Sequence, residues 1–259
     1  MELYKDIINS PHTLIAGTTG SGKSNVMNGI IREIMTSYSP DEARLYIFDP
    51  KVVELEDYKN TEYCARFETE FDGMIDALDE LIQIMNDRYH EMSGTGVKEY
   101  RGQRIYLIFD ELADALSAPT NRVIGMIKTR LQVLLQKGRA SRITVIAATQ
   151  NPNREIVSGK LTINFTNRLG LRCMDDKESK VIVKRKGCEL LPKYGKALYL
   201  SPDGCKPVDI PLTPSNRDLI QRHRKAPAVK SAPRRNDTAG IITLVGLGLM
   251  AWGLLGGVL

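Results

Sequence analysis

The feature that most constrains this chain is a glycine-rich octapeptide near its N-terminus, GTTGSGKS, at residues 17–24. It fits the pattern G-x-x-x-x-G-K-[ST], follows an apolar run (13–16) and opens a helix-like run (25–31). A loop between a strand and a helix is the setting in which this pattern binds nucleotide phosphates, because backbone N–H groups converge there at the positive end of the helix. The octapeptide therefore predicts a P-loop nucleotide-binding site and an α/β fold to hold it.

Individual residues of this loop take distinct predicted roles. Gly17, Gly20 and Gly22 allow a tight turn and a close approach of the backbone to phosphate. Lys23 is expected to reach the β- and γ-phosphates, and the Ser24 hydroxyl to ligate Mg²⁺. The predicted cofactors are therefore ATP and Mg²⁺. The residues that we expect to bind ATP are Gly17, Thr18, Thr19, Gly20, Ser21, Gly22, Lys23, Ser24 and Asn25.

Beyond the loop, apolar runs alternate with amphipathic segments. Strands are predicted at 13–16, 45–48, 105–109, 143–148, 168–173 and 197–200. Helices, in which apolar residues recur every three or four positions, are predicted at 24–35, 71–89, 121–137 and 176–184. This alternation is typical of α/β proteins. We expect a doubly wound, RecA-like P-loop NTPase domain, whose mainly parallel sheet carries helices on both faces.

Polar residues follow two of the predicted strands. The run 105–109 ends in Asp110 and Glu111. In P-loop proteins an aspartate at such a strand end holds Mg²⁺, a role that we assign to Asp110, while Glu111 is the candidate general base that polarises the attacking water. The next strand ends beside Gln150, whose side chain is predicted to sense the γ-phosphate at the same sheet edge. The alternatives are a strand-end cap, a surface charge and a loop cap, respectively.

Arginines are the candidates for a contribution between subunits. In several P-loop proteins an arginine supplied by a neighbouring molecule stabilises the transferring phosphate. Three arginines flank the fourth and fifth predicted strands, and each is a candidate arginine finger: Arg139, Arg142 and Arg168. For each one, a surface arginine without a catalytic part is the alternative.

The C-terminal end differs from the rest in composition. Residues 214–237 are polar, basic and proline-containing, which predicts a linker, and residues 238–259 are 22 residues without a charge. As a helix the latter would span about 33 Å, enough for a bilayer core of about 30 Å. Arg234 and Arg235 precede it, which places the domain on the cytoplasmic face. We expect a P-loop domain (1–213), a linker and a single transmembrane helix.

Charge and cysteine content narrow the choice of partners and compartment. The net charge of +5 equals the excess of seven basic over two acidic residues between positions 217 and 237, so residues 1–216 are balanced. A balanced domain does not bind nucleic acid through bulk charge, and such a partner must be recognised by local motifs. The four cysteines form no C-x-x-C pair, which argues against a zinc site or a disulfide framework and favours a reducing compartment.

Taken together, the motifs resemble the FtsK/SpoIIIE family of DNA-translocating ATPases, within the FtsK–HerA group. The resemblance covers about residues 11–202 and is carried by six segments: PHTLIAGTTGSGKS (11–24), DPKVVEL (49–55), RYHEMSGTGV (88–97), DELAD (110–114), KGRA (137–140) and ATQNP (148–152). Each is similar to a pattern of the family, such as P-H-x-L-[IV]-A-G-T-T-G-S-G-K-S for the first. The resemblance implies an ATP hydrolase that translocates double-stranded DNA.

The same resemblance implies partners. They are double-stranded DNA, further copies of the chain in a ring, expected as a hexamer with nucleotide between subunits, and a membrane contacted by the C-terminal helix. The sequence shows no counterpart of the family's N-terminal membrane region or of its winged-helix module. We therefore expect a short motor of the mobile-element or viral type, which transfers the DNA of a mobile element.

Three alternative functions stay open at this point. The first alternative is a viral genome-packaging ATPase, and the second is a membrane-bound ATPase that moves protein. The third is a nucleotide-dependent switch that hydrolyses ATP slowly. Stimulation of hydrolysis by DNA distinguishes the DNA motors from the protein motor. The turnover rate distinguishes a motor from a switch.

Overall fold

The computed structural model describes residues 2–152, 161 and 163–226. Residues 2–225 form one unit, and the second part of the predicted linker (227–237) and the whole predicted span 238–259 lie outside the described residues. Within the described ranges, no helix has both the length and the apolar composition needed to cross a bilayer. The predicted localisation, a single-pass protein on the cytoplasmic face of a membrane, is corrected on this finding.

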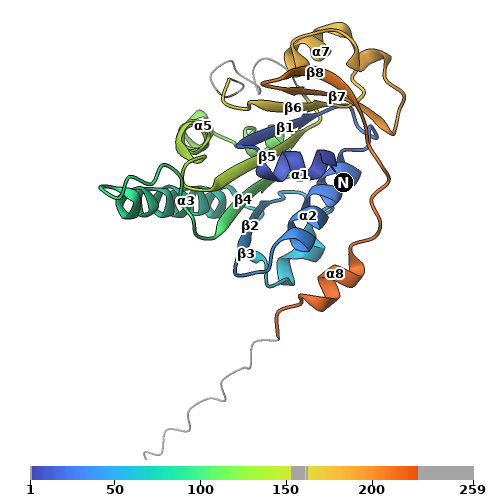
Figure 1. Cartoon of the computed structure of the whole chain (residues 1–259). Helices are drawn as coiled ribbons and strands as arrows, with labels where there is room; N and C mark the ends of the chain where they lie inside the picture. Colours follow the sequence, from blue (N-terminus) through green and yellow to red (C-terminus); the bar gives the residue numbers. More distant parts are fainter. Residues whose placement is uncertain (1, 153–160, 162, 227–259) are drawn as a thin grey trace, which may run out of the picture. The chain divides into compact units, whose positions relative to one another are not determined.

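A mixed eight-stranded sheet organises the domain, in the order β3-β2-β4-β5-β1-β6-β7-β8 (Figure 1). The strands from β3 to β6 are parallel, and β7 and β8 are antiparallel to their neighbours. Their bounds are β1 His12–Ala16, β2 Ala43–Phe48, β3 Cys64–Glu68, β4 Arg104–Phe109, β5 Ile143–Thr149, β6 Asn167–Gly170, β7 Lys196–Ser201 and β8 Gly204–Asp209. The mainly parallel α/β sheet predicted from the alternation is confirmed.

Two strands, β3 and β8, were not predicted, and both lie at the edges of the sheet. Every residue of β8 is exposed or half-buried, and the strand contains Pro207. Edge strands are covered less than central ones and tolerate proline and charge, so they lack the apolar run that marks a buried strand. The central strands β1 and β5 are buried along their whole length, which is why their sequences were easy to recognise.

Helices cover both faces of this sheet (Figure 1). One core cluster joins α1 and α2 to the sheet and includes Tyr4 and Ile30; a second joins α3 and α5 and includes Leu78 and Leu131; a third, smaller one includes Ile182 of α7. The helices and 3₁₀ segments are α1 Glu2–Asn9, α2 Lys23–Ser37, η1 Glu56–Asn60, α3 Phe71–Met92, α4 Leu112–Ala115, α5 Asn121–Lys137, α7 Asp176–Val183, η2 Cys188–Leu190 and α8 Arg217–Arg222. Among these, α1 is short and mixed in charge, and was not predicted.

The sheet brings several strand ends together at one edge. Ala16 at the end of β1 pairs with Thr149 at the end of β5, and Phe109 at the end of β4 pairs with Phe48 at the end of β2. The segments that follow these four parallel strands therefore emerge side by side at the carboxyl edge, where open α/β sheets bind their ligands. The fold thus assembles the phosphate loop and the polar residues after β4 and β5 in one place.

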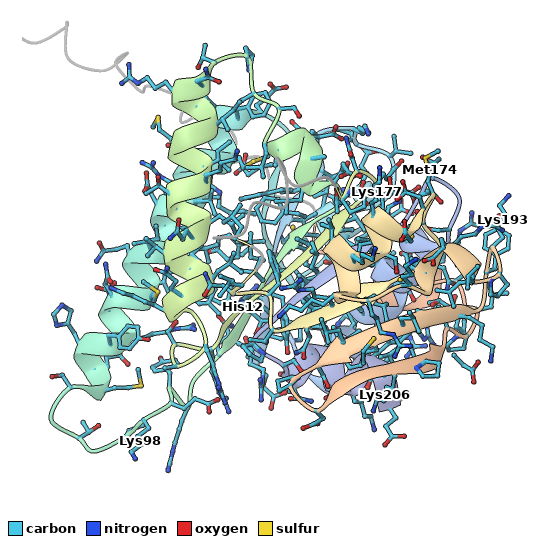
Figure 2. All side chains as sticks on the ribbon, turned by 90° about the horizontal axis from the view of Figure 1, so that it is seen from above. His12, Lys98, Met174, Lys177, Lys193 and Lys206 are labelled. Atoms are coloured by element: carbon cyan, nitrogen blue, oxygen red, sulfur yellow. The ribbon has the colours of Figure 1, made fainter. Side chains whose placement is uncertain are left out.

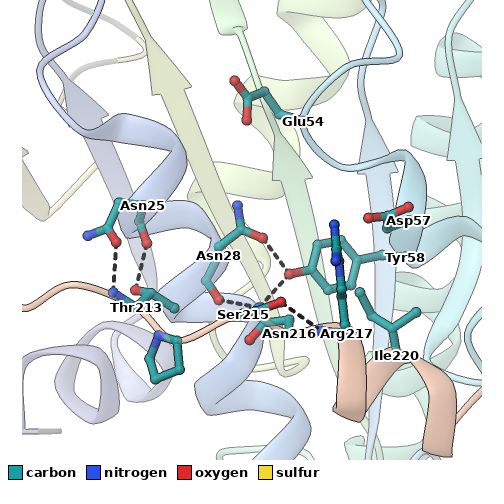
Figure 3. A pocket seen from close by; sticks show the side chains of 11 residues that line it. Asn25, Asn28, Glu54, Asp57, Tyr58, Thr213, Ser215, Asn216, Arg217 and Ile220 are labelled. Atoms are coloured by element: carbon teal, nitrogen blue, oxygen red, sulfur yellow. Dashed lines mark hydrogen bonds between the residues drawn. The ribbon is translucent and has the colours of Figure 1, made fainter.

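Residues 210–225, which we name the C-terminal strap, pack against the domain although much of this segment was predicted as linker. Asn216 is 6% exposed, and its side-chain amide donates to the Asn28 carbonyl (2.9 Å) and the Tyr58 hydroxyl (2.5 Å) (Figure 3). Farther along, the backbone N–H of Lys225 donates to the Asn60 carbonyl at 2.7 Å. A largely polar sequence is held here by buried hydrogen bonds together with two buried apolar side chains, Ile210 and Leu219, which join the core.

Two helical glycines give a matched test of this packing. A Cβ at Gly29 of α2 would collide with the ring of Tyr4, which is fully buried, whereas a Cβ at Gly125 of α5 would meet nothing within 4 Å. We expect Gly29→Ala to lower the free energy of unfolding by about 1–3 kcal/mol through overpacking. Gly125→Ala should raise it by about 0.5–1 kcal/mol through helix propensity. Denaturant unfolding measures both, and equal effects would contradict the packing of α1 on α2.

A second test concerns His12, the first residue of β1. Its Nδ1 accepts the backbone N–H of Val145 at 3.0 Å, and burial lowers its pKa from the usual 6.5 to about 4. Between these two values the unfolded chain binds a proton that the folded chain does not, so stability should fall as pH drops from 6.5 towards 4. The free energy of unfolding should therefore be lower at pH 5 than at pH 7. We expect this loss to be smaller for His12→Asn than for the unmodified chain. An unchanged difference would show that His12 is protonated in the fold.

Candidate nucleotide-binding site

The loop between β1 and α2 has the conformation that its glycines predict. Gly20 has φ +75° and Gly22, the residue before α2, has φ +98°. Residues other than glycine rarely adopt these values. The chain passes directly from Gly22 into the first turn of α2 at Lys23. Backbone N–H groups of the loop are therefore presented at the start of a 15-residue helix, where an anion is stabilised.

Hydrogen bonds attach this loop to segments on both sides of β1. The N–H of Gly17 donates to the Thr149 carbonyl of β5 (3.3 Å), and the N–H of Thr18 donates to the Arg172 carbonyl beyond β6 (2.9 Å). The hydroxyl of Ser21 is buried and has no hydrogen-bond partner among the described residues. A buried hydroxyl without a partner is costly, and a phosphate oxygen would satisfy it. These observations fit a bound phosphate chain.

Lys23 provides the cation of the site. Its side chain is 8% exposed, and its Nζ donates to the Gly17 carbonyl at 3.1 Å across the loop. Burial lowers the pKa of this ammonium, an effect opposed by the nearby carboxylates of Glu111 and Asp110. The charge is thus poorly solvated and only partly compensated, a state that favours an incoming polyanion.

Asp110 lies after β4 in an acidic environment. Its pKa is raised to about 6, first by burial and then by Asp49, Glu54 and Glu111, against the effect of Lys23. Clustered carboxylates resist ionisation together and release protons when a cation neutralises them. Asp110 therefore has the character expected of a Mg²⁺ ligand.

A complete metal cage is not present in the protein itself. Among residues 2–152, 161 and 163–226, no group of three or more histidine, cysteine or acidic side chains is arranged to hold a metal ion. Mg²⁺ is commonly bound by one or two carboxylates together with substrate phosphates and water. Ser24 and Asp110 are the two residues that would hold it here, and such a sparse protein set fits an ion that arrives with the nucleotide.

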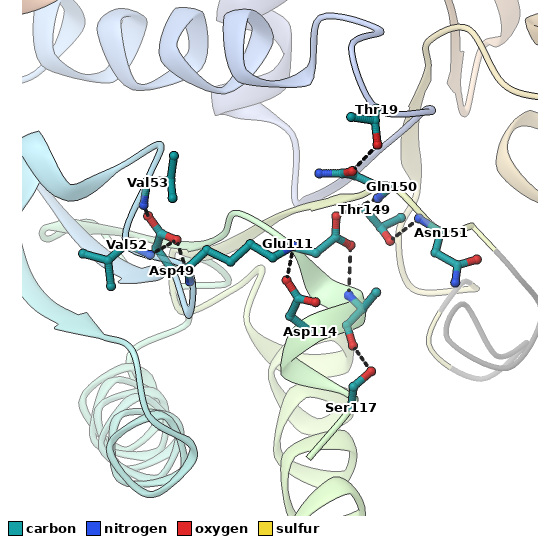
Figure 4. Close-up of polar contacts among 12 residues, drawn as sticks. Thr19, Asp49, Val52, Val53, Glu111, Asp114, Ser117, Thr149, Gln150 and Asn151 are labelled. Atoms are coloured by element: carbon teal, nitrogen blue, oxygen red, sulfur yellow. Dashed lines mark hydrogen bonds and ion pairs between the residues drawn. The ribbon is translucent and has the colours of Figure 1, made fainter. Parts of the chain in front are cut away.

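Glu111 ties two strand ends together. It is 4% exposed; one carboxylate oxygen accepts the N–H of Ala113 (3.1 Å), which caps α4, and the other accepts the N–H of Gln150 (2.8 Å) (Figure 4). The end of β4 is thereby hydrogen-bonded to the residue after β5. The candidate base is held rigidly beside Asp110 rather than projecting into solvent.

Gln150 extends this connection to the phosphate loop. Its Oε1 accepts the hydroxyl of Thr19 at 2.6 Å (Figure 4). Glu111, Gln150 and Thr19 therefore form a continuous relay from the strand bearing Asp110 to the loop. The structure thus brings together the loop, both carboxylates and the glutamine, as the sequence predicted; their catalytic roles stay predictions.

The three candidate arginines are not at this site. Arg168 is 4% exposed and donates to the carbonyl oxygens of Phe165 and Ile182, and burial lowers its pKa. A side chain enclosed in this way does not reach another subunit, so the structure does not support Arg168 as a finger. Its backbone partners explain why a strand-flanking arginine is present.

Arg139 and Arg142 lie in the turn between α5 and β5, at the amino end of β5 and hence at the edge opposite the phosphate loop. Arg142 donates to the Gly102 carbonyl at 3.1 Å, and its Nε is 3.6 Å from Glu99. Arg139 is exposed. Neither side chain is near the chain's own nucleotide site, so a finger role for either one requires a neighbouring copy.

The segment after β2 belongs to the site but was not assigned a role. Asp49 is fully buried and accepts backbone N–H groups from Lys51, Val52, Val53 and Leu55. This turn places Lys51 in an ion pair with Asp114 (2.8 Å) and brings Glu54 close enough to affect Lys23 and Asp110. The sequence did contain a signal for this segment: the DPK motif directly follows β2, a strand that neighbours β4.

Asn25, the last residue predicted to bind ATP, takes a structural role as well. Its side chain accepts the N–H of Thr213 (2.8 Å) and donates to the Pro211 carbonyl (3.0 Å), so it holds the C-terminal strap (Figure 3). Beside it lies a polar pocket of about 290 Å³, lined in part by Asn28, Glu54 and Asn216. The sequence carried no signal for this contact, because the two segments are 188 residues apart.

The sheet, the phosphate loop and the carboxylates after β4 define a P-loop NTPase. The profile of the FtsK/SpoIIIE family matches residues 2–194. The chain therefore belongs to the FtsK/SpoIIIE family.

Named relatives agree with this assignment. The chain is 28% identical to DNA translocase FtsK 1 of Neisseria meningitidis serogroup A, over 92% of the chain and 33% of that protein. It is 32% identical to DNA translocase SpoIIIE of Bacillus subtilis, over 77% of the chain and 27% of that protein. The chain thus spans a third or less of these two relatives.

Solved structures share the fold at low sequence identity. The monomer form of the pCW3 conjugation coupling protein TcpA with ATPγS superposes with a TM-score of 0.74 at 22% identity, over 84% of this chain and 66% of that one. The Type VII secretion ATPase EccC of Thermomonospora curvata gives 0.68 at 15% identity, over 83% of this chain and 28% of that one. At these identities the likeness shows the fold alone.

The environment of Lys23 leads to a prediction that separates folding from binding. Lys23→Met removes a poorly solvated charge, so we expect the nucleotide-free protein to unfold at the same or a higher temperature. MgATP at about 100 times its dissociation constant should stabilise the unmodified chain by about 2.7 kcal/mol and the variant not at all. Thermal unfolding with and without MgATP provides the measurement, and Lys51→Met is the matched control. Equal stabilisation of both variants would rule out Lys23 as the phosphate ligand.

Proposed function

We propose that the chain is an ATP hydrolase that uses ATP to translocate double-stranded DNA. The observation that carries this proposal is the relay Glu111–Gln150–Thr19, which links the candidate base, the strand next to it and the phosphate loop. Membership in a family whose named relatives are DNA translocases supports the choice of DNA as cargo. Because the chain spans only part of these relatives, its activity and its partners are proposals that rest on the relay and on family membership.

The residues of the site divide the work of hydrolysis among them. Backbone N–H groups of residues 17–25 and the Lys23 ammonium bind the phosphates, with Ser24 and Asp110 placed to hold Mg²⁺. Bound Mg²⁺ neutralises charge on the β- and γ-phosphates. Glu111 orients a water and accepts its proton, and its own orientation is set by the N–H of Gln150.

The relay also provides a means of reporting the nucleotide state. Thr19 lies in the phosphate loop and Gln150 follows β5, so loss of the γ-phosphate near Thr19 changes the partner available to Gln150. Because the N–H of Gln150 also donates to Glu111, a change at Gln150 alters the positions of the base and of the segment after β5. A translocase needs such a link between chemistry and the surfaces that grip DNA.

We further propose a ring of several copies, expected as a hexamer, with DNA in its centre. Membership in the FtsK/SpoIIIE family supports this proposal, and the exposed Arg139, at the edge opposite the chain's own site, is the arginine that we propose contacts the nucleotide of a neighbouring copy. In a charge-balanced domain, DNA is gripped by local contacts to its phosphates without base readout.

The deciding experiment is the ATPase rate of the full chain with and without linear double-stranded DNA. We expect a several-fold stimulation, lost in Lys23→Ala because phosphate binding fails and in Glu111→Gln because the base is removed. Removing a catalytic base typically slows a reaction by about 10²–10⁴-fold. Glu111→Gln should still bind MgATP, which separates catalysis from binding, and Glu56→Gln, an exposed glutamate on η1, is the control.

Hydrolysis that is rapid and indifferent to DNA would contradict a DNA cargo and point to a protein motor. Hydrolysis that stays very slow with DNA would indicate a nucleotide-dependent switch. An Arg139→Ala variant, whose loss of activity is restored by mixing with Lys23→Ala subunits that retain Arg139, would identify the finger between copies.

A further inference from the structure

An exposed aromatic ring lies against the phosphate loop. Tyr194, two residues before β7, is 60% exposed, and its Cδ1 is 3.8 Å from the position that a Cβ at Gly22 would take. The neighbouring Lys193 approaches Gly20 in the same way, with its Cε at 3.6 Å, and its Nζ lies 5.2 Å from the centroid of the Tyr194 ring. Figure 2 shows Lys193 projecting from the surface on the side of α7 and Met174.

The strand order decides which end of a bound nucleotide this ring faces. On one side of β1 lie β5 and β4, which end at Gln150, Asp110 and Glu111; on the other side lie β6 and β7. The metal ligand and the base act on the γ-phosphate, so that end of the nucleotide points towards β5 and β4. The nucleoside end therefore points towards β6 and β7, where Tyr194 is located.

A second exposed apolar side chain is held near the same place. Leu212 in the C-terminal strap is 89% exposed, more than any other large hydrophobic residue in the described ranges. The residues on both sides of it, Pro211 and Thr213, are hydrogen-bonded to Asn25 at 3.0 and 2.8 Å. An isolated exposed leucine needs no explanation, but the backbone on both sides of this one is hydrogen-bonded to Asn25 in the first turn of α2.

We propose that Tyr194 stacks on the base of the bound nucleotide and that Leu212 packs against the nucleoside from the strap. The inference rests on the proposed function, in that it requires a nucleotide on the phosphate loop. Every base offers a π-face, so stacking on an aromatic ring is strong but does not distinguish one base from another. Lys193 beside the ring adds a positive charge close to the phosphates. The site should therefore bind ATP and GTP with similar affinity.

Titration calorimetry on the full chain tests this directly, with MgATP, MgGTP and magnesium tripolyphosphate as ligands. Tripolyphosphate occupies the loop but has no nucleoside. We expect Tyr194→Ala to weaken ATP and GTP binding about tenfold, the effect typical of losing one stacked base, and to leave tripolyphosphate binding unchanged. Leu212→Ala should act in the same direction, more weakly. Tyr194→Phe, which keeps the ring, and Leu190→Ala, an 83% exposed side chain at the end of η2, are the controls.

Three results would overturn the inference. Unchanged ATP binding by Tyr194→Ala would show that the ring does not contact the nucleoside. An equal loss of ATP and tripolyphosphate would show that Tyr194 only supports the loop. A wild-type preference for ATP over GTP of a hundredfold or more would exclude stacking as the main contact. If the unmodified chain binds neither ATP nor tripolyphosphate, the proposed function itself fails, and this outcome is distinct from the other three.

Discussion

The hydrogen bond from the Gln150 N–H to the Glu111 carboxylate is the contact on which the rest of the site depends. It joins the ends of two neighbouring parallel strands, and through the Thr19 hydroxyl it continues to the phosphate loop. Each group in this relay is positioned by the next, so the phosphate loop, the candidate base and the residue after β5 are linked by hydrogen bonds. A buried carboxylate held by backbone N–H groups is both stable and well oriented, which suits the proposed role of Glu111 as general base.

Around this contact the site is electrostatically unbalanced. Lys23 is buried with a lowered pKa, and Asp110 is crowded by other carboxylates that raise its pKa to about 6. Without a ligand, the charged forms of both Lys23 and Asp110 are disfavoured, because burial opposes both charges. In the proposed function, MgATP would supply a polyanion for the lysine and a cation for the aspartate. The same features that weaken the fold locally therefore favour the bound ligand, as functional sites often do.

Much of this arrangement was readable from the sequence. Central strands such as β5 are buried along their whole length and carry continuous apolar runs. Asp110 and Gln150, which follow β4 and β5, lie at the same carboxyl edge because these strands are parallel neighbours. The edge strand β8 was missed because it is exposed and contains a proline. The burial of Arg168 was not predicted, because arginines in solvent and arginines bonded to buried carbonyl groups look alike in a sequence.

By itself, the sequence determined the P-loop, the alternation of the central strands with the longer helices, and the chemistry available at the strand ends, because these follow from local pattern and from the identity of residues close together in the chain. Only the tertiary structure decided that Glu111 holds Gln150, that Asp49 turns Glu54 towards Lys23, and that Asn25 binds a strap 188 residues away. These contacts use common polar side chains and backbone groups. Which of these groups bond to one another depends on which ones the fold brings within hydrogen-bonding distance. Local sequence does not contain that information.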